Sequence, residues 1–297
     1  MEKIKIVFLG TGNAIPTKER NHSAILLHYK NESILIDCGE GTQRQFRFAD
    51  ISPTKLTRVL ITHWHGDHIL GLSGLFQTLA MNNYQKTLYM YGPKGTKHDL
   101  SLLNELIKIK IPLSVHEVDG KFLEMPEFMI EASAMNHTAS TNAYAFVVKE
   151  KRRLDKNKLK KLKLPNSPLI GKLQRGENIS INGKIIKASQ VSYVEKGRKI
   201  AVILDTLYNK NAIQLAKNAD ILICESSFSN EEKAQAREYK HLTAEQAATI
   251  AKKAGVKHLV LTHISQRYEH NFKKIKDEAS RIFKKITIAH DLQSFEI

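Results

Sequence analysis

The most constraining feature of this chain is a six-residue run, His63-Trp64-His65-Gly66-Asp67-His68, which holds three imidazoles and one carboxylate. The residues before it, Thr57–Thr62, have the apolar pattern of a buried strand, and Ile69–Leu79 after it has the pattern of a helix. The run therefore occupies a strand-to-helix turn at the carboxyl end of a strand, where open α/β sheets place their functional sites. A solvated loop or a purification tag has neither the preceding strand nor the interleaved aspartate.

Five apolar strands predicted from the sequence, including the one before His63, end in a residue that can bind or orient a metal ion. The residues at these strand ends are Asp37, His63, Asp205, Glu225 and His263. One polar residue at a strand end is ordinary, whereas five favour a common site. If the strands are parallel and lie in one layer, we expect their ends to meet at a single edge.

The candidate ligands supply imidazole and carboxylate but no thiolate: His63, His65, Asp67, His68, His137, Asp205 and His263. Four or five ligands satisfy one Zn²⁺, so seven imply two ions if one carboxylate bridges them. The lack of cysteine indicates catalytic metal, and paired ions about 3.5–4 Å apart suit phosphoryl chemistry. On its own context His137 is the least secure ligand, because a lone histidine after a strand is usually structural. The sequence leaves Zn²⁺, Mn²⁺ and Fe²⁺ open.

Predicted strands and helices alternate in both halves of the chain, which indicates an α/β protein with sheets covered by helices. The length of 297 residues suits one large domain or two small ones, and a hydrophobic content of 42% is enough for a sizeable core. The capping-box pattern Thr243-Ala244-Glu245-Gln246 predicts where one helix starts. The predicted helices are His68–Ala80, Thr96–Ile107, Asn209–Asn218, Ala244–Ala254 and Asn271–Phe283.

Residues from about 149 to 188 break this alternation. They are rich in lysine, then loop-like around Pro165–Pro168, then similar to a short hairpin at Ile181–Lys184. Their apolar residues are too sparse for an independent core. We therefore expect one domain over residues 1–297, with this segment as an insertion.

The net charge of +16 suggests a polyanionic partner, which could be RNA, DNA or an anionic membrane surface, although a solvated lysine-rich surface is the alternative. Nine basic residues crowd the segment Lys149–Lys163, against only Glu150 and Asp155. The segment lacks interleaved aromatic residues that would stack on bases, so it suits phosphate contacts better than sequence reading. The candidate contacts are Lys151, Arg152, Arg153, Lys160 and Lys161.

The remaining features favour a cytoplasmic protein. Met1–Lys5 interleaves charged and apolar residues, unlike a signal peptide. No apolar run approaches the roughly 20 residues that a membrane helix needs, so we expect no membrane partner. Cys38 and Cys224 lie in or beside apolar strands, and two thiols make no disulfide framework.

The sequence resembles the metallo-β-lactamase superfamily, whose hallmark is a His-x-His-x-Asp-His run, and within it the tRNase Z family. The similar segments extend over nearly the whole chain: Phe8–Gly12, Pro16–Asn21, Asp37–Gln43, Glu225–Phe228 and His241–Ala244. The lysine-rich insertion occupies the place of the family's tRNA-binding arm. It has Ser167-Pro168 where many relatives have Gly-Pro, which leaves the conformation of the arm open.

The resemblance implies a four-layer αββα sandwich that holds two Zn²⁺ per subunit and works as a homodimer on precursor tRNA, one subunit's arm gripping the tRNA that the other cuts. The ligands of the first zinc would be His63, His65 and His137, those of the second Asp67, His68 and His263, with Asp205 bridging.

Further roles follow from the same resemblance. Asp37 would orient a ligand imidazole. Asp67 would also orient or deprotonate the attacking water. His241, supported by Glu225, would stabilise or protonate the leaving 3′ oxygen, giving a tRNA with a 3′-OH and a trailer with a 5′-phosphate. Lys18 and Arg20 would lie on a loop near RNA phosphate.

Two alternatives remain. Another phosphodiesterase or hydrolase of the same superfamily could act on small esters, although a small substrate needs no phosphate-tracking arm. A non-catalytic RNA-binding protein could use metal only to fold, but that alternative predicts missing ligands, and every expected ligand is present in the sequence.

Overall fold

The structure is a computed structural model that describes residues 2–162, 168–181 and 183–297. The strands of its first large sheet are β1 (Ile4–Gly10), β2 (Ala24–Tyr29), β3 (Glu32–Ile36), β4 (Arg58–Leu60), β5 (Leu88–Gly92), β6 (Leu113–Glu117) and β18 (Ser294–Glu296). Their order is β18-β1-β2-β3-β4-β5-β6, with parallel pairing from β3 to β6.

The strands of the second large sheet are β7 (Gly120–Glu124), β8 (Phe128–Ala134), β9 (Asn142–Val148), β14 (Arg198–Ile203), β15 (Ile221–Glu225), β16 (Leu259–Thr262) and β17 (Ile286–Ile288). Their order is β17-β16-β15-β14-β9-β8-β7, and β14 to β17 pair in parallel. The parallel strands are buried along their length, which accounts for their continuous runs of Val, Ile and Leu.

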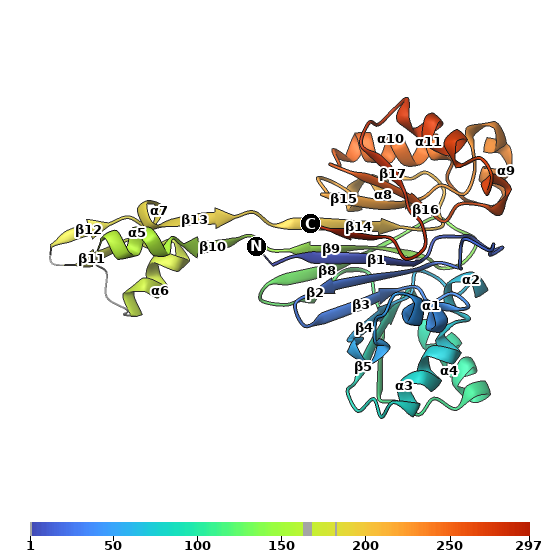
Figure 1. Cartoon of the computed structure of the whole chain (residues 1–297), viewed down its shortest axis with the longest axis horizontal. Coiled ribbons are helices and arrows are strands. Elements are labelled where there is room, and N and C mark those ends of the chain that lie inside the picture. The colour runs from blue at the N-terminus through green and yellow to red at the C-terminus, as the bar shows by residue number, and fades with distance from the viewer. Residues whose placement is uncertain (1, 163–167, 182) are drawn as a thin grey trace. The chain divides into compact units, whose positions relative to one another are not determined.

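Helices cover the outer face of each sheet (Figure 1). On the first sheet these are α1 (Thr42–Phe48), α2 (Gly66–Ile69), α3 (Leu72–Met81) and α4 (Thr96–Ile107), with a short turn η1 (Pro53–Lys55). On the second they are α8 (Lys210–Leu215), α9 (Lys233–Glu238), α10 (Ala244–Ala254) and α11 (Phe272–Ser280), with the turns η2 (Asn230–Glu232) and η3 (Gln266–Tyr268). The expected αββα sandwich is confirmed.

Apolar side chains from both sheets fill the space between them. Leu27, Ile34 and Leu60 of the first sheet face Tyr144 and Val202 of the second. Each such buried aliphatic side chain contributes about 1.5–3 kcal/mol. The buried hydroxyl of Tyr144 donates to the carbonyl of Ile61 at 2.7 Å, so the single polar atom of this ring has its partner.

The predicted helix Ala244–Ala254 is confirmed as α10. The Thr243 hydroxyl accepts from the amide of Gln246 at 3.3 Å, and the Gln246 side chain accepts from the amide of Thr243 at 3.0 Å. Gly255 ends the helix with φ 65°.

The predicted single helix His68–Ala80 is wrong, because the chain forms α2 and α3 with a break at Gly71. The amide of Gly71 donates to the carbonyl of Cys38 at 2.9 Å. A β-carbon at Gly71 would lie 2.0 Å from the carbonyl oxygen of Gly39. This close approach of two backbones fixes the break, and a local apolar pattern does not reveal it.

Two compact units can be distinguished: residues 124–129 with 147–198, and residues 2–123, 130–146 and 199–297. We call residues 147–198 the basic insertion. Its elements are β10 (Lys151–Leu154), α5 (Lys156–Lys161), α6 (Pro168–Arg175), β11 (Ile179–Ile181), β12 (Lys184–Ile186), α7 (Ala188–Val191) and β13 (Ser192–Glu195). β10 pairs antiparallel with β13, so the ordered pair extends past residue 188 to Glu195. Lys163 and Ser167 lie outside the described residues.

The basic insertion has a small apolar cluster of its own, contrary to expectation. The side chains of Leu173, Ile179, Ala188 and Val191 are buried there, and Leu159 packs against them. These residues come from α5, α6, α7 and β11, so no single stretch of sequence shows an apolar face. The predicted hairpin is present as the antiparallel pair β11 and β12.

Among the described residues, the helices are too short or too polar for any of them to span a membrane.

Candidate metal centre

The strand-end residues converge from two sheets, so the expectation of one layer is wrong. Asp37 and His63 follow β3 and β4 of the first sheet. Asp205 and His263 follow β14 and β16 of the second, and Glu225 ends β15. Because the two sheets pack face to face, the carboxyl ends of both sets of parallel strands reach the same edge of the sandwich.

Three of these residues have left-handed backbone conformations immediately after their strands. The φ angles are 57° at Asp37, 41° at Asp205 and 53° at His263. Such angles are uncommon outside glycine, although Asp and His adopt them more readily than most residues. Backbone strain of this kind costs about 1–3 kcal/mol per residue and gathers at functional sites. The strain therefore marks the edge at which the candidate ligands meet.

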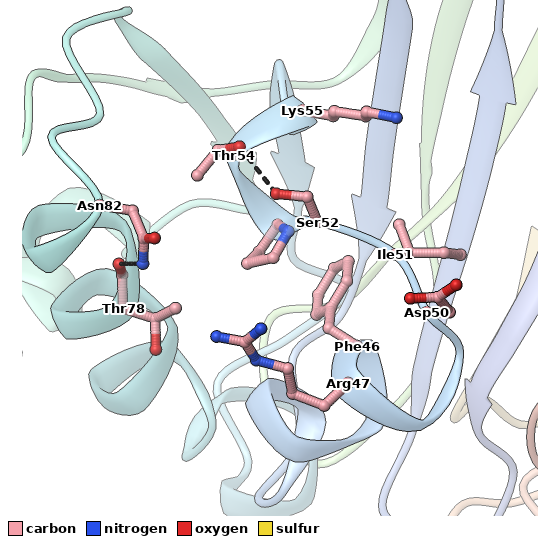
Figure 2. Close-up of a pocket in the computed structure, with 10 residues that line it drawn as sticks. Phe46, Arg47, Asp50, Ile51, Ser52, Thr54, Lys55, Thr78 and Asn82 are labelled. Carbon is pink, nitrogen blue, oxygen red and sulfur yellow. Dashed lines mark hydrogen bonds between the residues drawn. The ribbon is translucent and has the colours of Figure 1, made fainter.

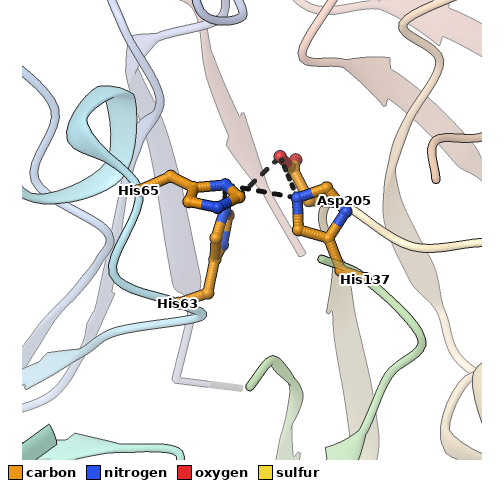
Figure 3. A group of neighbouring side chains, drawn as sticks. All are labelled: His63, His65, His137 and Asp205. Atoms are coloured by element: carbon orange, nitrogen blue, oxygen red, sulfur yellow. Dashed lines mark hydrogen bonds and ion pairs between the residues drawn. The ribbon is translucent and has the colours of Figure 1, made fainter. Parts of the chain in front are cut away.

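The first group of candidate ligands is His63, His65, His137 and Asp205 (Figure 3). One ligand atom from each lies within 4.8 Å of all the others. His65 Nδ1 is 3.3 Å from His137 Nε2, and Asp205 Oδ2 is 3.6 Å from His63 Nε2. Tetrahedral coordination with bonds of about 2.0–2.1 Å separates ligand atoms by about 3.3 Å. The spacing therefore fits a divalent cation.

The second group is Asp67, His68, Asp205 and His263. His68 Nε2 lies 3.2 Å from Asp67 Oδ2 and 3.4 Å from Asp205 Oδ2. His263 Nε2 lies 3.2 Å from Asp205 Oδ1. Asp205 belongs to both groups, so its carboxylate could serve as a ligand in each.

Two unsatisfied atoms support this fit. His68 Nε2 and Asp205 Oδ1 are buried and have no hydrogen-bond partner. The Nδ1–H of His68 donates to Asp37, so Nε2 is the ring nitrogen that faces the carboxylates of Asp67 and Asp205. Buried carboxylates that face one another are unfavourable unless positive charge lies between them. The donor set, imidazole and carboxylate without thiolate, suits the charge of a catalytic Zn²⁺.

The carboxylate of Asp67 is ionised. Burial alone would raise the pKa of Asp67, but the neighbouring His68 and His263 hold it well below its ordinary value.

Polar side chains behind the ligands fix the orientation of the rings. Asp37 accepts from His68 Nδ1, from the Thr62 amide and from the Thr62 hydroxyl, each at 2.7 Å. His137 Nδ1 donates to the carbonyl of Lys240 at 3.0 Å, which directs its Nε2 toward the first group. Such contacts hold the tautomer and the direction of each ligand. His137, insecure from sequence, therefore has the hydrogen bond that a ligand imidazole needs.

The partly exposed His241 pairs with the buried Glu225, and together with Asp205 and His263 they form a third group whose ligand atoms lie within 4.8 Å of one another. His241 Nδ1 lies 3.0 Å from Glu225 Oε2, and Glu225 is fully buried. Although burial lowers the pKa of His241, the charges of Glu225 and Asp205 outweigh it and raise the pKa to about 9. In the absence of bound cations, His241 is therefore charged at neutral pH. It lines a cavity of about 390 Å³ together with Asp67 and His263.

The predicted contact between Arg20 and RNA is wrong. Arg20 is only 2% exposed, and its guanidinium donates to the Thr11 hydroxyl and the Ala289 carbonyl, each at 2.7 Å. It also lies over the ring of Phe272 at 4.2 Å. Arg20 thus ties its loop to the C-terminal part of the chain, whereas Lys18 on the same loop is exposed.

The five candidate contacts of the basic insertion differ in their surroundings. Lys160 and Lys161 are exposed on α5. Lys151 pairs with Glu127 at 3.1 Å and Arg153 with Glu195 at 2.6 Å, while Arg152 donates to Ser192 at 2.9 Å. Exposed pairs of this kind are weak and can be exchanged for a phosphate.

Another pocket, of about 290 Å³, lies among α1, η1 and α3 (Figure 2). Its ten lining residues include one carboxylate, Asp50, and no histidine or cysteine. This lining does not provide the ligands for metal chemistry.

Three residues that support the ligands had no predicted role. Thr62 holds Asp37, Ser227 lies 2.9 Å from His263 Nδ1, and the carbonyl of Lys240 holds His137. Ser227 lies in the segment Glu225–Phe228, so its position beside Glu225 was a usable signal. Thr62 resembles any polar residue at a strand end, and a carbonyl contact leaves no mark in the sequence.

We expect fully loaded protein to hold two metal ions per chain, because two ligand groups share one carboxylate. Elemental analysis after reconstitution would measure this ratio. Asp205→Ala removes the shared ligand and should lower metal content, whereas Asp220→Ala, which removes a surface partner of Lys257, should not. A maximum of one ion in the unmutated protein would contradict the bridged pair.

Curated relatives match this chain over its whole length. The ribonuclease Z of Methanothermobacter thermautotrophicus is 37% identical over 298 residues, covering 99% of this chain and 97% of the relative. That of Chlamydia abortus is 38% identical, covering 98% and 96%. A family model described as Anti-Pycsar protein Apyc1 matches residues 4–154, a range that ends before Asp205 and His263.

Solved structures share the fold. Human tRNase Z, short form, superposes with a TM-score of 0.70 at 25% identity and 98% coverage of both chains. The metallo-β-lactamase fold protein YhfI of Bacillus subtilis superposes with a TM-score of 0.74 at 20% identity and full coverage of both chains. The full-length similarity and the His/Asp centre lead to one conclusion: the chain belongs to the ribonuclease Z family and is a metal-dependent hydrolase of the metallo-β-lactamase fold.

Proposed function

We propose that this protein removes the 3′ trailer from precursor tRNA with two Zn²⁺ as cofactors, leaving a 3′-OH on the tRNA and a 5′-phosphate on the trailer. The observation that carries the proposal is the pair of ligand groups joined at Asp205, with His241 held by Glu225 next to them. Full-length relatives named ribonuclease Z support the substrate class.

The metals would be held by His63, His65 and His137 on one side and by Asp67, His68 and His263 on the other, with Asp205 between them. When bound, the two cations would supply the positive charge that offsets the developing charge of an in-line displacement at phosphorus.

The chain's own residues supply the proton transfers. Asp67 lines the cavity, where its carboxylate can orient the water that attacks phosphorus and accept a proton from it. The bond from phosphorus to the 3′ oxygen then breaks. With Nδ1 of His241 held by Glu225, its Nε2 is the nitrogen left to donate a proton to that oxygen.

The basic insertion is the proposed tRNA-binding arm. Residues 147–198 hold fifteen basic and four acidic residues, and Lys160 and Lys161 are exposed. A density of positive charge of this kind favours a phosphate backbone, and it gives small substrates no advantage.

The proposal is tested by incubating the metal-loaded protein with a 3′-extended precursor tRNA, with and without a chelator. We expect one endonucleolytic cut, a 5′-phosphate on the released trailer, and no cut in the chelated sample. Rapid hydrolysis of small phosphodiesters with an intact precursor would favour the alternative substrate class.

His241→Ala should slow the cleavage step about a hundredfold or more while the metal content stays the same, because His241 contributes a proton and no metal bond. Single-turnover rates and elemental analysis would separate the two effects. His270→Ala, which removes an exposed histidine, is the matched control. Loss of metal from His241→Ala would show that the imidazole is a ligand.

We also propose that the protein is a homodimer in the cytoplasm. Met81 and Leu106, on α3 and α4, are 85% and 81% exposed, and an apolar groove lies beside them. Burial of such a patch against a second copy is favourable. Both cysteines are free, as expected in a reducing compartment.

Leu106→Glu should therefore convert a dimer to a monomer, because a charge would be buried at the contact. Light scattering coupled to size-exclusion chromatography would measure the mass. Lys276→Glu, on the exposed side of α11, should leave the mass unchanged. A monomeric unmutated protein would refute the dimer itself.

A further inference from the structure

An exposed aromatic side chain stands at the rim of the metal-centre cavity. Tyr239 is 54% exposed, and its ring lies parallel to that of Phe228, with 6.3 Å between the centroids and an angle of 8°. Both residues line the cavity that holds Asp67 and His241. The open face of the Tyr239 ring therefore adjoins the cavity of the candidate metal centre.

Backbone hydrogen bonds of Phe228 and the contacts of Lys240 fix the positions of the aromatic pair of Phe228 and Tyr239. Phe228 is buried, and its backbone is bonded to Leu242 and Ala244 at the start of α10. Tyr239 is followed by Lys240, which has φ 56° and whose carbonyl and ammonium groups both bond to His137. The segment with Tyr239 is thereby tied directly to a candidate metal ligand.

The cation near the aromatic pair is already engaged. The guanidinium of Arg267 lies 5.0 Å from the ring of Phe228 and donates to Gln235 at 2.8 Å and to Glu232 at 3.4 Å. These hydrogen bonds partly compensate the charge of Arg267. Arg267 therefore packs against the aromatic pair more than it attracts a phosphate. The rim therefore offers a π-face, which suits a base.

We propose that Tyr239 is a positioning residue that stacks on the base of the nucleotide immediately 5′ of the scissile phosphate. The inference rests on the proposed function, in which the leaving 3′ oxygen of that nucleotide lies at His241. The ring of Phe228 lies 6.0 Å from that of His241, and Tyr239 stacks beside it. The base of the nucleotide that carries this 3′ oxygen would therefore lie on the same side of the cavity as Tyr239.

Stacking of this kind tolerates any base, because each has a π-face. It would hold the last nucleotide of the mature tRNA without reading its identity. The stacked base restricts the position of the scissile phosphate, so removal of the ring should lower kcat/KM for RNA.

The test combines two changes, one in the protein and one in the RNA. Tyr239→Ala should lower kcat/KM for precursor tRNA about tenfold or more, and Tyr239→Phe, which keeps the ring, should restore it. An abasic nucleotide 5′ of the cut should lower the rate of the unmutated protein by a similar factor. With this abasic RNA, Tyr239→Ala should cause no further decrease, because the stacking partner is already gone.

Two controls make the result specific. The rate decrease caused by an abasic nucleotide 3′ of the cut should multiply with the decrease caused by Tyr239→Ala. Phe48→Ala, which removes a 56% exposed ring outside the cavity, should leave cleavage unchanged. If the decreases from Tyr239→Ala and the 5′ abasic nucleotide multiply, the stacking proposal is overturned while the nuclease function stands. If the unmutated protein does not cut the precursor, the proposed function fails and the inference fails with it.

Discussion

Replacing Asp67 with alanine is expected to lower the rate of precursor cleavage at least about a thousandfold while leaving precursor affinity within about threefold. Asp67 lies 3.2 Å from His68 Nε2 and 3.4 Å from His263 Nε2, so its replacement removes a ligand from the second group. It also removes the carboxylate proposed to take the proton of the attacking water. Single-turnover kinetics would report the rate, and filter binding would report the affinity.

The matched control is Asp277→Ala, which removes an exposed aspartate on α11. It should change neither quantity. A rate decrease below about tenfold for Asp67→Ala would mean that another group activates the water. A large decrease in affinity would place Asp67 in RNA binding and not in the cleavage step.

Excision of most of the basic insertion, the proposed tRNA-binding arm, should have the second large effect. This effect is a loss of affinity for precursor tRNA. Lys151 and Glu195 are register partners in β10 and β13, so the chain enters and leaves this segment at neighbouring positions. Residues 151–195, which include both strands, can therefore be replaced by a short Gly-Ser linker that joins Glu150 to Lys196. The excised segment holds twelve basic and three acidic residues. We expect precursor affinity to fall at least about tenfold near 0.15 M salt. The salt slope should flatten by about 0.9 for each duplex phosphate that the arm no longer neutralises.

The excised variant is also its own control for chemistry. None of the seven candidate ligands lies within residues 151–195, so metal content should be unchanged. A small phosphodiester that the full chain hydrolyses should be hydrolysed at a similar rate. If tRNA affinity were unchanged, the loop with the exposed Lys18 would become the better candidate for RNA binding. A deletion of only Lys151–Gly176 would be a poorer design, because it removes Leu173 from its apolar cluster and leaves β13 without its partner β10.

Local signals predicted the parts of the fold that local interactions determine. The capping pair Thr243 and Gln246 lies within four residues, and α10 begins as expected. The run from His63 to His68 likewise carries four candidate ligands in one turn, so neighbouring positions in the chain are neighbours in the site.

Long-range contacts explain what local patterns missed. Arg20 looks like a surface cation, yet Thr11 and Ala289 accept its hydrogen bonds in the interior, and residue 289 is far away in the chain. The break at Gly71 depends on Gly39, and the cluster in the arm depends on side chains from several short elements. The periodicity of apolar residues shows which face of one helix or strand is buried. It therefore cannot predict contacts between elements that are far apart in the sequence.

The origin of the ligands from both sheets has a consequence for folding itself. Cations held between His63 or His68 and His263 or Asp205 would act as cross-links across the sandwich. Ligands that bind only the native state add RT ln(1 + [L]/Kd) to its stability, about 4.1 kcal/mol for each ion at a thousand times its Kd. The strained left-handed backbone at Asp205 and His263 would oppose folding of the protein without metal. Metal binding would compensate for the free-energy cost of this strain. Metal supply would thus govern how long the folded enzyme persists, as well as how fast it cuts.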